Sequence, residues 1–132
     1  MYHFRTGGSN IANKTGRNYG MEDHFKRAVT EMLVLTLLSR EDLPAVQIMQ
    51  RVEDETEHTI GLVSPYMLFY RLIEDGCIIE AYKKPAPDGR RRQYYQISED
   101  GKRYLADLVA LYHRLTNGVA SLLGGEIKSN GE

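Results

Sequence analysis

The stretch that most constrains the fold is residues 77–98, CIIEAYKKPAPDGRRRQYYQIS. Two runs rich in β-branched and aromatic residues flank the turn sequence PAPDG, which predicts an antiparallel hairpin. Side chains alternate between the two faces of a strand, so we expect Tyr95 and Ile97 to face the core. The outward face should then carry Arg92, Tyr94 and Gln96.

Helical patterns precede the hairpin. Apolar residues recur at helical spacing from Glu22 onward, and the acidic residues at this start suit the positive end of a helix dipole. A shorter helix should follow, with Pro44 in its first turn, and end among the acidic residues 53–55. The sequence therefore predicts two helices before residue 56.

A third helix lies just before the hairpin and a fourth just after it. Ser64 and Pro65 suit the N-cap and first helical positions of the third helix, and Gly76 suits its C-terminal end. Ser98 should cap the fourth helix, which continues to about Leu123. Three short helices, a hairpin and a further helix predict a mainly α fold with a two-stranded β wing, a winged helix-turn-helix.

The chain divides into four parts on this interpretation. Residues 1–20 are rich in Gly, Asn and Thr without an apolar period, and are expected to be a flexible N-terminal arm or an expression leader. Residues 21–98 form the winged helix-turn-helix DNA-binding domain. Residues 99–124 form a C-terminal dimerisation helix, and residues 125–132 a flexible tail.

Basic charge is concentrated at the hairpin tip. The net charge is only -1, yet the ten positions from Lys83 to Arg92 hold five basic residues and one acid, Asp88. Arginines on a projecting turn can reach DNA phosphates. The alternative is an ordinary solvated turn.

Winged helix-turn-helix proteins place the third helix in the major groove and the wing along the DNA backbone. Residues of these two elements are therefore the candidates for DNA contact. They are Ser64, Tyr66, Met67, Tyr70, Lys84, Arg90, Arg91, Arg92 and Tyr94.

The last helix carries an apolar seam whose residues are spaced alternately three and four apart, the a/d pattern of a coiled coil. The seam residues are Leu105, Leu108, Tyr112, Leu115, Val119 and Leu122. A small winged helix offers little surface to cover such a stripe, which favours pairing with a second chain. Packing against the chain's own domain is the alternative.

Other site classes lack support in the sequence. The longest apolar runs are too short to span a bilayer and no signal-peptide pattern is seen, so we expect a cytoplasmic protein that does not enter a membrane. Cys77 is the only cysteine, and is interpreted as a core residue rather than a redox switch. The histidines lack metal-ligand spacing, and no catalytic motif is present. We predict no metal, no cofactor and no enzymatic activity.

The run DGRRRQYYQISEDGKRYL resembles the wing and following helix of the PadR family of bacterial transcriptional regulators. AVTEMLVLTLLS and YRLIEDGCI fit the first and third helices of that family. The resemblance covers about Phe25 to Leu123. It implies dimerisation through the last helix and, as in some members, a small-molecule effector bound nearby.

The sequence therefore predicts a sequence-specific DNA-binding transcriptional regulator, a repressor that binds an inverted-repeat operator as a homodimer. The rival is a winged-helix module that binds a protein partner. It draws support from the third helix, which has Arg71 as its sole basic residue and should expose Tyr66, Met67 and Tyr70.

Overall fold

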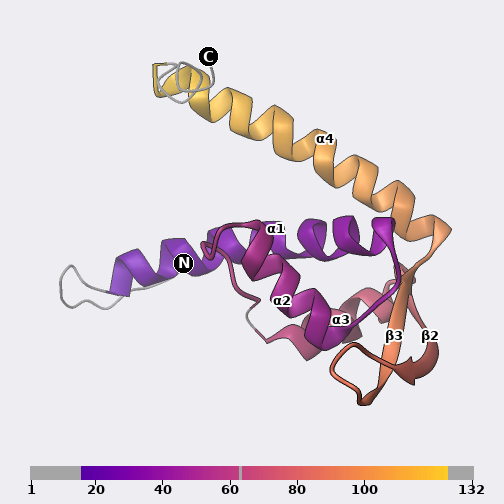
Figure 1. The fold of residues 1–132 in the computed structure, drawn as a ribbon. Coiled ribbons are helices and arrows are strands. Elements are labelled where there is room, and N and C mark those ends of the chain that lie inside the picture. Colours follow the sequence, from indigo (N-terminus) through magenta and orange to yellow (C-terminus); the bar gives the residue numbers. More distant parts are fainter. Residues whose placement is uncertain (1–15, 63, 125–132) are drawn as a thin grey trace.

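The computed structural model describes residues 16–62 and 64–124 (Figure 1). Most of the expected N-terminal arm and the whole expected tail lie outside these residues. The elements in chain order are α1 (Gly16–Arg40), β1 (Leu43–Pro44), α2 (Ala45–Glu55), α3 (Pro65–Glu74), β2 (Ile78–Pro85), β3 (Arg91–Ile97) and α4 (Glu99–Leu122).

Helix α1 begins at Gly16, six residues before the start that the apolar pattern predicts. Residues 16–20 of the expected arm are therefore helical. They lack an apolar stripe, but a helix that has formed extends at little further cost, because each added residue gains a backbone hydrogen bond. Helices α2, α3 and α4 agree closely with their predicted ranges.

The sheet has three antiparallel strands in the order β1-β3-β2, where the sequence predicts two. The additional strand is two residues long, and pairs Leu43 with Tyr95 and Pro44 with Tyr94. The sequence pattern predicts Pro44 in the first turn of α2, but it lies in β1 and is the N-cap of that helix. Proline has no amide hydrogen to donate to a sheet, and an edge strand tolerates it because one side of that strand needs no ladder hydrogen bonds.

One hydrophobic core joins the first three helices to the sheet. Leu35 of α1, Ile48 of α2 and Leu72 of α3 are fully buried there. The ring of Phe69 stacks on that of Tyr95 with 5.3 Å between centroids, which fixes α3 against β3. Tyr95 and Ile97 are buried as the strand alternation predicts.

Hydrogen bonds at the helix ends connect α3, the wing and α4. Gly76 has φ +77° just after α3, and the amide of Cys77 donates to the carbonyl of Leu72 (2.9 Å), a Schellman ending. Ser98 caps α4 as predicted, because its Oγ accepts from the amide of Gly101 (2.9 Å). The same Oγ donates to the carbonyl of Gly76 (2.6 Å). The start of α4 is thereby joined to the end of α3.

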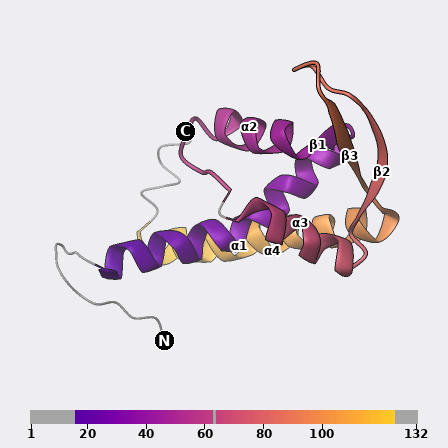
Figure 2. The same cartoon turned by 90° about the horizontal axis from the view of Figure 1, so that it is seen from below.

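Helix α4 starts beside the sheet and runs back along α1, diverging from it toward the N-terminus of α1 (Figure 1). Seen from below, the β2-β3 hairpin projects from the end of the molecule at which α4 begins (Figure 2). None of the helices in residues 16–62 and 64–124 has the length and apolar character needed to cross a bilayer.

Candidate nucleic-acid interface

Helix α3 presents a polar-aromatic surface to solvent. Tyr66 and Tyr70 are each 63% exposed and Met67 is 68% exposed, whereas Phe69 and Leu72 are buried. Residues four apart share a helix face, so the two tyrosines form one exposed stripe. The expected orientation of this helix is confirmed.

Ser64 occupies the predicted N-cap position of α3, but its side chain forms no capping hydrogen bond. Its backbone has φ +50°, and its carbonyl accepts from the amides of Met67 (3.1 Å) and Leu68 (3.2 Å). The left-handed conformation, uncommon outside glycine, turns the side chain away from the helix amides. Ser64 is exposed at the N-terminal end of α3, beside Tyr66.

Arg71, the only basic side chain of α3, is held by α1. Its Nη2 and Nε donate to Oε2 of Glu31 at 2.9 and 3.1 Å. Oε1 of the same carboxylate accepts from the hydroxyl of Tyr104 on α4 (2.8 Å), and this bond raises the pKa of Tyr104 to about 12. Glu31 therefore connects three helices.

The wing tip is a preformed turn organised by Asp88. One carboxylate oxygen accepts from the amide of Arg90 (3.0 Å), and the other accepts from Nη2 of Arg92 (2.7 Å). The hydrogen bond from the Arg92 side chain, and to a smaller extent that from the Arg90 amide, lowers the pKa of Asp88. Gly89 supplies the positive φ of +85° that the turn requires.

The three predicted wing arginines divide into two kinds. Arg92 is half-buried and paired with Asp88, so its guanidinium already has a partner. Arg90 and Arg91 are exposed, and neither forms an ion pair with any residue in the described ranges. The free positive charge of the tip is thus carried by Arg90 and Arg91.

Strand alternation predicts Tyr94 on the outward, DNA-facing side of the wing, but Tyr94 is only 5% exposed. The unpredicted strand β1 pairs with it through Pro44, and its ring stacks on Tyr82 (5.3 Å between centroids). Lys84 Nζ lies 4.9 Å from the centre of the Tyr94 ring. Tyr94 therefore supports the wing, and the exposed group above it is the ammonium of Lys84.

The base of the wing is held by Asp42. Its Oδ2 accepts from the hydroxyl of Tyr82 (2.7 Å) and from Nε2 of Gln96 (3.2 Å). The bond to Asp42 raises the pKa of Tyr82 to about 12. A neutral tyrosine and a short polar loop thus join both wing strands to the end of α1.

The apolar seam of α4 changes character along the helix. Leu105 and Leu108 are partly buried against the domain's own core. Tyr112, Leu115 and Val119 are 37%, 57% and 56% exposed, and Leu122 is 88% exposed. The first two seam positions follow the alternative of packing on the same domain. Of the last four, Tyr112, Leu115 and Val119 are partly exposed and face α1 across a cavity, and Leu122 is open to solvent.

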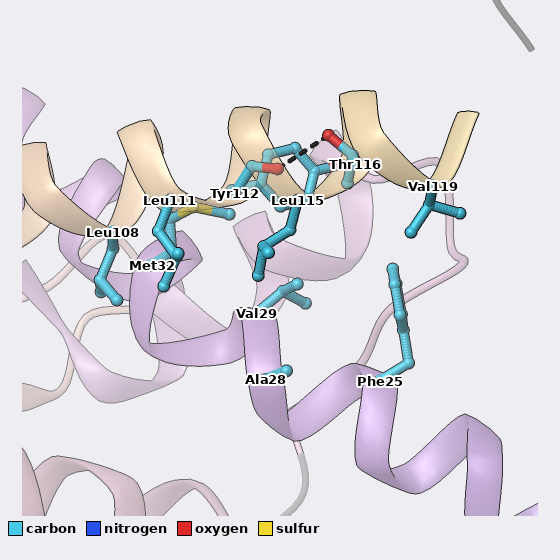
Figure 3. A pocket seen from close by; sticks show the side chains of 10 residues that line it. All are labelled: Phe25, Ala28, Val29, Met32, Leu108, Leu111, Tyr112, Leu115, Thr116 and Val119. Carbon is cyan, nitrogen blue, oxygen red and sulfur yellow. Dashed lines mark hydrogen bonds between the residues drawn. The ribbon is translucent and has the colours of Figure 1, made fainter. Parts of the chain in front are cut away.

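A cavity of about 290 Å³ lies between α1 and α4. Side chains of both helices point toward each other across it (Figure 3). Its lining is almost entirely apolar, and consists of Phe25, Ala28, Val29, Met32, Leu108, Leu111, Tyr112, Leu115, Thr116 and Val119.

Sequence reasoning missed Glu31, Asp88 and the α1 wall of this cavity as functional positions. Only Asp88 left a signal, as the one acid in the basic run. Within residues 16–62 and 64–124, no group of three or more histidine, cysteine or acidic residues is placed to hold a metal ion. Cys77 is buried, and burial raises the pKa of its thiol, as fits a core residue.

Solved structures of similar fold are transcriptional regulators. A PadR family transcriptional regulator from Eggerthella lenta is 27% identical and has a TM-score of 0.67, with 82% of this chain and 93% of that chain covered. A PadR-like transcriptional regulator from Bacillus cereus has the same fold, at 24% identity and a TM-score of 0.65, over 76% of this chain and 96% of the other.

Sequence comparison gives the same family. An uncharacterized protein from Lysinibacillus sphaericus is 33% identical over 85 residues, which are 63% of this chain and 77% of the relative. The model of the transcriptional regulator PadR-like family matches residues 34–107, more than half of the 132 residues. With its winged helix fold and its wing sequence, the chain belongs to the PadR-like family of transcriptional regulators.

Proposed function

We propose that this protein is a cytoplasmic transcriptional repressor that binds an inverted-repeat operator in double-stranded DNA as a homodimer. The observation that carries the proposal is the pairing of an exposed helix α3 with a wing tip whose Arg90 and Arg91 are exposed and without ion pairs in the described ranges. Helix and wing lie at the same end of the molecule (Figure 1).

The two elements suit different parts of a duplex. A helix fits the major groove, which is wide enough to admit one. A projecting basic turn suits the phosphates, because guanidinium groups form paired hydrogen bonds with phosphate oxygens. The tie between Asp88 and Arg92 fixes the turn before DNA arrives, so little conformational entropy is lost on binding.

The open half of the α4 seam supports the homodimer. Leu115, Val119 and Leu122 form an exposed apolar stripe at heptad spacing. Phe25 of α1, 55% exposed, adds to it across the cavity. A twofold dimer would cover this surface and present two α3 helices to the two halves of an inverted repeat. The proposed repression would act by occupancy, with the bound dimer blocking access of other proteins to the same DNA.

The cavity between α1 and α4 supports a small apolar or aromatic effector. Its volume of about 290 Å³ is close to the lower limit for ligand sites. Its walls come from α1, which supports α3, and from α4, which carries the seam. A bound ligand would therefore act on the separation of the two DNA-reading units.

The test is to recover genomic fragments that the purified protein retains, and to measure affinity for the shared sequence and for random duplex at two salt concentrations. We expect an inverted repeat, tighter binding to it, and affinity that falls steeply with salt because phosphate contacts release counterions. The rival, a protein-docking module, predicts no enrichment of any sequence and no retained DNA. That outcome would reject the repressor.

A further inference from the structure

The residue types of α3 limit which bases it can read. Its ten residues are PYMLFYRLIE, with no lysine, histidine, asparagine or glutamine. The bidentate contacts that identify guanine require arginine or lysine, and those that identify adenine require asparagine or glutamine. Arg71 is therefore the only side chain of this helix that could form a bidentate contact with a purine.

Arg71 is committed elsewhere. Two of its guanidinium nitrogens, Nε and Nη2, donate to the carboxylate of Glu31 on α1. Reaching a guanine would separate this ion pair and leave Glu31, whose side chain is only 18% exposed, without its cationic partner. The pair thus holds the one purine-reading group of α3 against α1, although its side chain remains 52% exposed.

The surface that remains is mostly apolar. Tyr66, Met67 and Tyr70 present aromatic rings and a thioether at 63%, 68% and 63% exposure. The single apolar group on the major-groove edges of the bases is the C5-methyl of thymine. A tyrosine hydroxyl or the Ser64 hydroxyl can add one hydrogen bond to a base. A single hydrogen bond distinguishes the four base pairs less well than a bidentate contact does.

We propose that α3 recognises its half-site through the C5-methyl groups of thymines, contacted by Tyr66 and Met67 with Tyr70 on the adjoining turn. This inference rests on the proposed DNA-binding function. It assigns the chemistry of base readout, which is methyl contact rather than hydrogen bonding to guanine. The positions of the half-site that face α3 are accordingly occupied by A·T pairs with defined thymine strands.

Deoxyuridine provides the direct test, because it keeps the hydrogen-bonding groups of thymine and lacks only the methyl group. The retained operator is synthesised with each half-site thymine replaced in turn, and affinity is measured by fluorescence anisotropy. We expect about a fourfold loss at each contacted position, the factor that corresponds to burying one methylene-sized group. Replacement of thymines between or outside the half-sites serves as the matched control and should have no effect.

Protein variants identify which side chain contacts which methyl. In Met67→Ala and Tyr66→Ala, the deoxyuridine penalty should disappear at the position that each side chain contacts and persist elsewhere. Both side chains are exposed, so the variants should fold, which thermal unfolding checks. Arg90→Ala should retain every penalty while binding all the duplexes more weakly.

Three results would overturn the proposal, and each has a different meaning. If the wild type prefers its operator but binds the thymine and deoxyuridine forms equally, methyl readout is wrong while DNA binding stands. If 7-deazaguanine, which lacks the N7 acceptor of guanine, abolishes the preference for the operator when placed in the half-site, the protein reads a guanine and not thymine methyl groups. If no duplex of either kind is bound in preference to random DNA, the proposed function itself fails.

Discussion

Arg71 of α3 and Glu31 of α1 form an ion pair 2.9 Å long in which a single carboxylate oxygen accepts two guanidinium hydrogen bonds. The other oxygen accepts from Tyr104 of α4. The orientation of the proposed DNA-reading helix is thus connected to the helix of the proposed dimer seam through one side chain.

Replacing Glu31 with Gln should release Arg71 toward solvent and DNA. We expect higher affinity for random duplex and a salt slope steeper by about 1 for each phosphate that Arg71 then neutralises. The free energy of unfolding should fall by no more than about 1 kcal/mol, because the arginine is half exposed. Salt-titrated anisotropy and thermal unfolding measure the two effects. Tyr104→Phe, which keeps the ion pair, is the control; an unchanged slope in Glu31→Gln would show that Arg71 does not reach DNA.

Removing the charges of Arg90 and Arg91 together should weaken binding to operator and to random DNA by similar factors. Hydrogen bonds to phosphate oxygens carry no base information, so the ratio of the two affinities should hold. The salt slope should fall by about 1 for each phosphate that is no longer neutralised. Arg114→Ala on α4, an exposed arginine on another element, controls for net charge. A loss confined to the operator would place an arginine on the bases, and no loss would make the tip a solvated turn.

The exposed half of the α4 seam should determine the oligomeric state. Leu115→Asp with Val119→Asp would place four charges in one twofold interface, where unpaired buried charge is strongly unfavourable. Light scattering should then report a monomer. Leu108 is a poor choice for this test, because it packs on the domain's own core. Asn117→Asp with Ser121→Asp adds the same charge at the same spacing off the seam and should leave the dimer intact; a dimeric seam variant would refute the assignment.

Substitution by alanine at two glycines of α4 should change the free energy of unfolding in opposite directions. A Cβ at Gly101 would lie 2.1 Å from the backbone oxygen of Cys77, so the start of α4 must shift away from Cys77. We expect Gly101→Ala to lower the free energy of unfolding by about 1 to 3 kcal/mol. A Cβ at Gly118 meets nothing within 4 Å, and Gly118→Ala should raise it by up to about 1 kcal/mol through helix propensity. Denaturant unfolding at equal protein concentration measures the free energy of unfolding of both variants. Equal changes in the two variants would contradict the close approach at Gly101.

The winged helix could be predicted from the sequence because its signals are local. Gly76, Ser98 and the PAPDG turn each act through their own backbone conformation. Strand β1 could not be predicted, since two residues show no period and its pairing partner Tyr95 is 52 positions away. The burial of Tyr94 follows from that missed strand. The inward face of β3 was predicted correctly, but on the outward face the side chains of Tyr82 and Lys84 lie against the Tyr94 ring.

Which arginines of the candidate site are paired with a carboxylate could not be predicted from the sequence either, because it depends on which side chains the fold brings together. The sequence shows three wing arginines, and only the folded turn shows that Asp88 engages Arg92. The sequence also shows one arginine on α3, Arg71. Only the fold brings Glu31, which lies 40 positions earlier, against this arginine. Exposed residues such as Tyr66 were predictable because a helix face follows from spacing alone.

The length of α4 has a geometric consequence. Its 24 residues span about 36 Å at 1.5 Å per residue, close to one turn of B-DNA. One end is fastened to the end of α3 by Ser98, and the other carries the exposed seam. In the proposed twofold dimer, the position of the seam along such a helix would set the distance between the two operator half-sites. Evolution could change the spacing that is read by shifting the seam one heptad along α4, without altering any residue that touches a base.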